Sequence, residues 1–175
     1  YYQGAKDLKI VIFTNQSNES RWSYFRYLSH CWNSKFDKRF FATNESEMSE
    51  LSLYLENIYE KRNSNLGESS SSNTLDDKSL YLNFSDYYLI ITDDFKMSKD
   101  IPIINKIISK EKNLGFSLLI FENSINNLPS KFDNFIDITD DICGIFGRNV
   151  DTDSQVKFKA NYLKNLDMDF YTEVL

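Results

Sequence analysis

The sequence predicts an α/β protein, a three-layer sandwich built around a mainly parallel central sheet. Three short apolar runs support this prediction, at residues 8–14, 87–92 and 116–121. Each run is apolar over most of its length, which is typical of a strand that is buried on both faces. Segments with helical patterns stand between the runs. Such alternation of strands and helices is typical of parallel sheets that are covered by helices.

The N-terminal part of the chain is expected to hold the first strand and the first helix. Residues 8–14 form the strand, and residues 21–28 form a helix with Ser20 or Asn18 near its cap. Residues 39–42 make a second short apolar segment.

The clearest helix begins at Asn44 or Ser46. Its apolar residues recur at steps of three and four, which is the stripe of an amphipathic helix: Met48, Leu51, Leu55 and Ile58. The two basic residues at 61–62 suit a helix C-terminus, so the helix is expected to end there. Residues 63–79 include four consecutive serines and are expected to form a flexible low-complexity loop inserted within the domain.

The second half of the chain continues the alternation. Residues 87–92 form the second strand, residues 101–108 form a helix with Pro102 in its first turn, and residues 116–121 form the third strand, entered through Gly115.

A shorter fourth strand and a hairpin are expected near the end of the chain. The fourth strand spans residues 135–138. Alternating apolar and polar residues predict a hairpin of residues 144–148 with 155–159. A last helix is expected to begin at Asp167.

Composition limits the classes of function. The 175 residues fit a single domain, residues 1–175. Acidic residues number 26 and basic residues 20, so a nucleic-acid partner is not expected. No apolar run approaches the roughly 20 residues that span a bilayer, so the chain is expected to be soluble. Cys31 and Cys143 are far apart and lack metal-site spacing, which argues against a disulfide scaffold or a zinc site.

Ligands of parallel α/β sheets bind at the carboxyl ends of the strands. Four pairs of polar residues follow the predicted strands and mark this edge: Thr14 with Asn15, Asp93 with Asp94, Glu122 with Asn123, and Thr139 with Asp140.

Asp93 and Asp94 are the most suggestive candidates for catalysis. Four apolar residues followed by two acids have the form of a Walker B element, in which the first acid holds Mg²⁺ and the second orients the attacking water. By that pattern Asp93 is the candidate Mg²⁺ ligand. The simpler interpretation, which we favour, is an acidic pair that ends a buried strand at the solvent. The companion phosphate-binding motif G-x-x-x-x-G-K-S/T does not occur in the sequence.

Aromatic residues gather between residues 22 and 36 and could stack on bases. The acidic balance instead favours a role in the core or at an interface for Trp22 and Trp32. His30 is the single histidine, and structural packing is expected of it rather than catalysis.

The order of these segments resembles a known family. The residues that carry the likeness are RWSYFRYLSH at 21–30, similar to a W-x-x-x-x-x-LPH segment with Ser29 in place of proline, the strand at 87–93, the strand at 114–121 and the Leu-Pro pair at 128–129. Together they resemble the first cytoplasmic ATPase-like domain of the FtsK/SpoIIIE-type membrane translocases of type VII (ESX-type) secretion, the EssC/EccC family.

The resemblance implies a degenerate P-loop NTPase domain of the RecA-like type. The parent would be a bacterial motor anchored in the membrane, with this domain on the cytoplasmic side and Mg-ATP bound elsewhere in the motor. The family's phosphate-loop equivalent precedes the strand at Leu8 and would lie upstream of Tyr1. Asp93 and Asp94 would then be a Walker-B-like pair that is degenerate.

The resemblance also implies the work and the partners of the domain. It would couple neighbouring ATPase domains to the membrane stalk through protein contacts, in a complex that secretes WXG100-type proteins. Other subunits of that complex would be further partners. The residues expected at such interfaces are Trp22, Leu28, His30 and Trp32.

Two alternatives remain open on sequence alone. The domain could be a working Mg-dependent ATP hydrolase of the same motor. It could instead be a stand-alone α/β module of the receiver or flavodoxin type, although Glu122 and Asn123 stand where a receiver needs a lysine.

Overall fold

The computed structural model describes residues 7–69, 84, 86–109, 113–130, 132, 134–138, 143–148 and 155–159. The chain divides into two compact units, whose described residues fall within 7–121 and 122–159 respectively. The single domain predicted from the sequence, residues 1–175, stays a prediction. The predicted helix from Asp167 lies outside the described residues.

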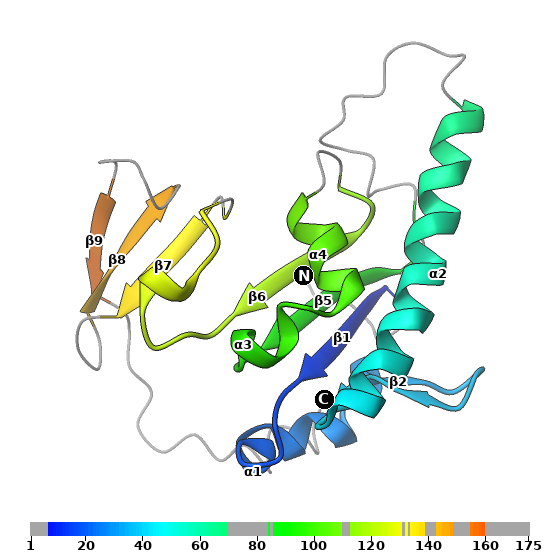
Figure 1. Ribbon diagram of the computed structural model, residues 1–175, viewed down its shortest axis with the longest axis horizontal. Helices are drawn as coiled ribbons and strands as arrows, with labels where there is room; N and C mark the ends of the chain where they lie inside the picture. Colours follow the sequence, from blue (N-terminus) through cyan, green and yellow to red (C-terminus); the bar gives the residue numbers. More distant parts are fainter. Residues whose placement is uncertain are drawn as a thin grey trace. The chain divides into compact units, whose positions relative to one another are not determined.

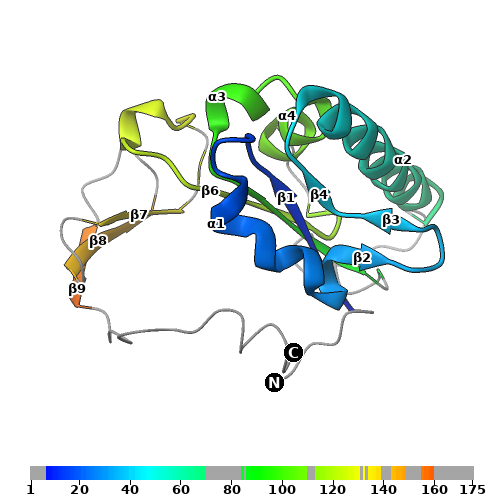
Figure 2. The ribbon, with the colours of Figure 1, turned by 90° about the horizontal axis from the view of Figure 1, so that it is seen from below.

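Four parallel strands form the sheet of the first unit. Their order is β4-β1-β5-β6; Figure 1 labels β1, β5 and β6, and Figure 2 labels β4. The strands are β1 (Leu8–Phe13), β4 (Phe41–Ala42), β5 (Tyr87–Thr92) and β6 (Phe116–Ile120). In the central pair, Leu8 lies opposite Tyr87 and Phe13 opposite Thr92, so β1 and β5 end at the same level.

Helices cover both faces of this sheet (Figure 2). On one face lie α2 (Glu45–Ser69), α3 (Phe95–Ser98) and α4 (Pro102–Ser109), which enclose the larger apolar core with residues such as Leu55 and Ile104. On the other face, α1 (Glu19–Trp22) and the 3-10 helix η1 (Ser23–Tyr27) cover a smaller core around Ile12 and Ile91. The predicted α/β sandwich with a parallel central sheet is therefore confirmed for the first unit.

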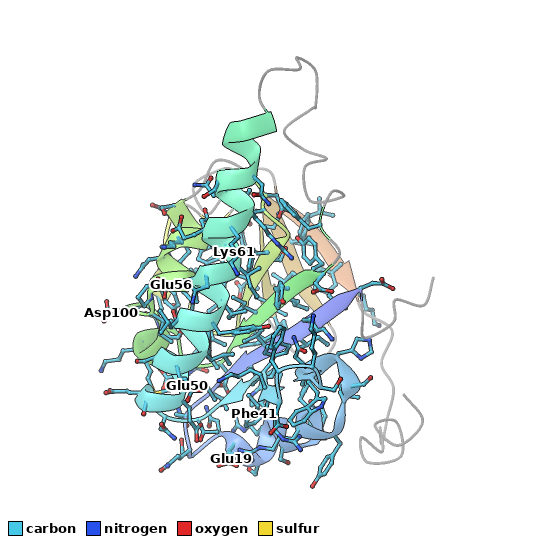
Figure 3. All side chains as sticks on the ribbon, turned by 90° about the vertical axis from the view of Figure 1, so that its right-hand side faces the viewer. Glu19, Phe41, Glu50, Glu56, Lys61 and Asp100 are labelled. Carbon is cyan, nitrogen blue, oxygen red and sulfur yellow. The ribbon has the colours of Figure 1, made fainter. Side chains whose placement is uncertain are left out.

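The helix predicted from Asn44 is α2, which continues beyond its expected end. Its start is confirmed, because Asn44 Oδ1 accepts a hydrogen bond from the Glu47 amide at 3.0 Å and Glu47 Oε2 accepts one from the Thr43 amide at 2.8 Å. Glu50, Glu56 and Lys61 mark its course in Figure 3. Residues 63–69 are helical rather than part of a loop, and residues 70–79 lie outside the described residues.

Arg62 explains why the helix does not end at the basic pair. Its guanidinium is buried and donates to main-chain carbonyls of Leu114 at 2.8 Å and Asp86 at 2.7 Å. It therefore fastens α2 to the segments that enter β5 and β6, instead of facing the solvent at a helix end. Although α2 is long, no helix among the described residues could cross a lipid bilayer.

A small hairpin connects the two sides of the first unit. After η2 (Ser29–Cys31), the chain forms β2 (Trp32–Asn33) and β3 (Lys38–Arg39), which pair antiparallel with Trp32 opposite Arg39. Asp37 has a positive φ of 49° in the intervening turn. This hairpin has no counterpart in the sequence prediction.

The second unit begins with the 3-10 turn η4 (Ile125–Asn127) and holds an antiparallel sheet of order β7-β8-β9. Its strands are β7 (Asn134–Ile138), β8 (Cys143–Arg148) and β9 (Gln155–Lys159). The predicted hairpin is confirmed as β8 and β9. The predicted fourth strand exists as β7, but its place in the parallel sheet was wrong, because β7 pairs with β8.

Aromatic rings lie over two glycines of β8. Phe135 stands opposite Gly147, and a Cβ on that glycine would lie 2.3 Å from the Phe135 ring. Phe158 stands opposite Gly144, and a Cβ there would lie 2.7 Å from its ring. Only glycine allows these two close approaches.

Candidate functional site

The candidate site lies where β1 and β5 end side by side. Thr14 and Asn15 directly follow β1, and Asp93 and Asp94 directly follow β5. The chain leaves β1 towards β4 at one side of the sheet, whereas β5 and β6 extend the sheet on the other side. The two strand ends therefore form a topological switch point, the usual place of a ligand site in such folds.

Both carboxylate oxygens of Asp93 accept hydrogen bonds from side chains. The Thr14 hydroxyl donates to Oδ1 at 2.7 Å, and the Trp22 indole N–H donates to Oδ2 at 2.7 Å. Thr14 is fully buried, so its bond to Asp93 satisfies a hydroxyl that has no access to water. Asp93 thus joins β1, β5 and α1.

The carboxylate of Asp94 is engaged in a similar way. It caps α3 by accepting from the Met97 amide at 3.0 Å, and it accepts from the Asn15 side-chain amide at 2.8 Å. Beneath it, the buried hydroxyls of Thr92 and Ser98 lie 3.0 Å apart within hydrogen-bond distance. Asp94 is therefore an N-cap that also ties the loop after β1 to the loop after β5.

Trp22 is held over Asp93 by aromatic packing. Its ring centroid lies 5.6 Å from the ring of Phe25 and 5.6 Å from that of Phe121. Sequence analysis placed Trp22 at an interface and missed its contact with Asp93. The local sequence carries no signal for this contact, because 71 residues separate the two side chains.

This arrangement limits what Asp93 can bind. Each carboxylate oxygen has two lone pairs, and the hydrogen bonds from Thr14 and Trp22 occupy one lone pair on each oxygen of Asp93. A Mg²⁺ ion bound directly to Asp93 would have to use a remaining lone pair and fit beside the Trp22 and Thr14 side chains. Chemically, the cluster is suited to holding three elements together.

The other predicted site residues belong to other segments of the chain. Leu28 is buried after η1, His30 lies in η2, and Trp32 lies in β2. Glu122 and Asn123 belong to the second unit. Thr139 and Asp140 lie outside the described residues.

Within the described ranges, no group of three or more His, Cys, Asp or Glu side chains is arranged to hold a metal ion. Comparison of the chain with protein-family models and with curated proteins finds no match.

Proposed function

We propose that this chain is a degenerate ATPase-like domain that works through protein contacts rather than by nucleotide hydrolysis. The observation that carries the proposal is the engagement of both strand-end acids in structural hydrogen bonds. Asp93 accepts from Thr14 and Trp22, and Asp94 caps α3. In an active hydrolase these two side chains would face a metal ion and a water molecule.

The loop after β1 has no features of a phosphate site. Its residues 15–20 contain neither glycine nor lysine, and Glu19 would repel a phosphate group. Asn15 Oδ1 accepts from the Asn18 amide at 2.9 Å, so this backbone donor of the loop is already used by an acceptor of the chain itself. The loop is therefore built as a connection and not as a phosphate cradle.

The wider role is proposed from the resemblance to the type VII secretion translocases. There the domain would stand between the membrane stalk and the following ATPase domains, and it would transmit their nucleotide state through contacts. The RecA-like form of the fold is part of this proposal. The parallel sheet with helices on both faces is compatible with it.

Calorimetry tests the nucleotide part of the proposal. Mg-ATP and Mg-ADP at millimolar concentration are titrated into the wild-type chain, into Trp22→Phe, which frees Asp93 Oδ2, and into Asp93→Asn. No binding heat is expected in any of them. Saturable binding to the wild type that disappears in Asp93→Asn would instead support a working Mg-dependent hydrolase.

A mixing experiment tests the coupling part. The chain is added to the ATPase module of a type VII translocase from the same genome, and the rate of ATP hydrolysis is measured. A saturable change in rate is expected, and the same addition of heat-unfolded chain serves as the control. An unchanged rate together with no complex in ultracentrifugation would contradict the coupling role.

One observation favours a second candidate, a module of the receiver or flavodoxin type. Numbered along the chain, the four strands lie in the order 2-1-3-4, which is the beginning of the flavodoxin-like order, and Asp93 lies at its switch point. A receiver would accept a phosphoryl group on this carboxylate. Incubation with Mg²⁺ and acetyl phosphate followed by intact-mass measurement decides, since a phosphoryl adduct that is absent in Asp93→Asn would favour this candidate.

A further inference from the structure

Positive charge is concentrated in one short part of an acidic protein. Residues 21–39 contain five basic residues and one acidic residue, whereas the whole chain has 26 acidic residues and 20 basic ones. The same segment is rich in aromatic residues. The structure places its C-terminal half in the β2–β3 hairpin, so the charges are presented on a defined element.

Three contacts, one from β1 and two from α2, hold the hairpin in place. The Lys9 ammonium of β1 donates to the Trp32 carbonyl at 3.3 Å, and the Asn33 side chain donates to the Tyr54 hydroxyl of α2 at 3.1 Å. Lys38 forms an ion pair with Glu50 of α2. Because these contacts fix the hairpin before any partner arrives, binding would cost little conformational entropy.

Two cations of the hairpin face outward without a carboxylate. Arg39 stacks 4.4 Å over the Trp32 ring and donates one N–H to the Arg26 carbonyl at 2.7 Å. Lys35 lies 5.4 Å from the Phe36 ring centroid. Among the described residues neither has an ion-pair partner, in contrast to Arg26 and Lys38.

Large apolar side chains accompany these cations. Phe36, in the hairpin turn, is 59% exposed, and Tyr27, which directly follows the carbonyl that Arg39 contacts, is 81% exposed. We call these residues the hairpin patch: Tyr27, Trp32, Lys35, Phe36 and Arg39. Arginine with exposed aromatic rings is the composition that dominates binding energy at protein interfaces.

We propose that the hairpin patch is a docking surface for an acidic polypeptide segment that also carries apolar side chains. Carboxylates would pair with Arg39 and Lys35, and apolar side chains would cover Phe36 and Tyr27. The inference stands without the proposed function, because it involves neither Asp93 nor nucleotide.

The acidic side chains next to the hairpin patch favour a short acidic polypeptide over an extended polyanion as its partner. Glu47 and Glu50 lie in the first two turns of α2, where Figure 3 labels Glu50. Glu50 is joined to the hairpin by its ion pair with Lys38. A nucleic acid or an anionic membrane is wider than the patch and would meet these carboxylates. The hairpin carries Lys35, Lys38 and Arg39 against Asp37, and Glu50 pairs with Lys38, so a net positive charge remains at the patch. Charges farther away than about 10 Å are screened at 0.1 M salt.

Fluorescence anisotropy tests the proposal with the full chain and a labelled peptide in which Glu and Phe alternate with Ser and Gly. Matched peptides replace every Glu with Lys, or every Phe with Ser. The test variant is Lys35→Glu with Arg39→Glu. The control is a pair of equal charge changes on exposed lysines elsewhere, Lys61→Glu with Lys99→Glu. Lys61 lies 11 positions beyond Glu50, about 16 Å along α2 (Figure 3).

The acidic peptide is expected to bind the wild type and to lose at least about tenfold in affinity in the test variant, against about twofold in the control. Raising the salt to about 0.5 M should weaken binding in the same way. The single variant Lys35→Glu keeps the Arg39 contacts and should cause an intermediate loss of affinity. It therefore tests the proposal even if the double variant fails to fold. The proposal would be overturned if the acidic peptide did not bind, if the Lys peptide bound equally well, or if test and control variants lost the same affinity. It would also be overturned if single-stranded DNA or phosphatidylserine vesicles bound the patch more tightly than the acidic peptide.

Discussion

Replacing Arg62 with methionine is expected to destabilise the first unit by about 3 kcal/mol. Arg62 as a residue is 8% exposed, and its guanidinium carbon lies 4.5 Å from the Phe84 ring centroid and 5.2 Å from the Phe116 ring centroid. Burial lowers the pKa of this guanidinium, but arginine keeps its charge in proteins. Methionine would fill much of the same volume and remove the charge and every donor.

The magnitude follows from the bonds that are lost. Two short hydrogen bonds run to the carbonyls of Leu114 and Asp86, and a hydrogen bond from a charged donor contributes about 1.5–3 kcal/mol. Their loss therefore costs about 3–6 kcal/mol. Methionine avoids the desolvation of a buried charge, which offsets part of that loss.

Urea unfolding followed by tryptophan fluorescence measures the effect. Both tryptophans, Trp22 and Trp32, belong to the first unit, so the signal does not report on the second unit. The exposed neighbour provides the control, because Lys61→Met should change the free energy of unfolding by less than about 0.5 kcal/mol. Arg62→Lys should lie between, since an ammonium keeps the charge but lacks the planar fork. A free energy for Arg62→Met within about 0.5 kcal/mol of the wild type would refute the reasoning.

Three further perturbations test other contacts. Gly115→Ala should destabilise by about 2 kcal/mol, because Gly115 has a φ of +80° and a Cβ there would lie 2.5 Å from an Arg62 nitrogen. Trp22→Phe removes the N–H that Asp93 accepts and should cost about 1–2 kcal/mol in thermal or urea unfolding. Burial raises the pKa of the Cys31 thiol from 9.0 to about 12, so the folded state favours the protonated thiol. Stability should therefore fall by about 1 kcal/mol between pH 9 and pH 10 through this group, and Cys31→Ala should remove that part of the fall.

Each of these outcomes can fail in a distinct way. A neutral Gly115→Ala would mean that Arg62 moves without loss. An unchanged stability of Trp22→Phe would show that water replaces the indole N–H at Asp93. For Cys31, the same pH dependence in the alanine variant would assign the alkaline loss to other groups, such as the buried phenol of Tyr88, whose pKa burial also raises.

Local patterns predicted the elements of the first unit well. Residues 8–14, 87–92 and 116–121 hold its longer strands, as the short apolar runs predict. Burial on both faces does not extend to the edge strand β6, where Leu119 is 43% exposed. The partner of a strand is not a local property. Residues 135–138 carry a similar short run, yet they pair with β8 in another sheet, and no feature of the run itself indicates this.

The same limit explains the two other differences. The end of α2 was predicted from the charge of Arg62, whose carbonyl partner Leu114 lies 52 positions away in the sequence. At the site, the strand rule brought Thr14, Asn15, Asp93 and Asp94 to one edge, as the structure has them. The hydrogen bond from the Trp22 indole N–H to Asp93 was missed because it is a tertiary contact, which depends on the packing of α1 against the sheet.

The glycines of β8 have a consequence for how the small antiparallel sheet assembles. Phe135 from one neighbouring strand and Phe158 from the other each cover a glycine of the central strand. If either outer strand slid by one residue, its ring would meet a side chain instead of the glycine, and every side chain of that strand would change face. The two ring–glycine contacts therefore favour one register for each strand pair, so a sheet of three short strands selects a single pairing.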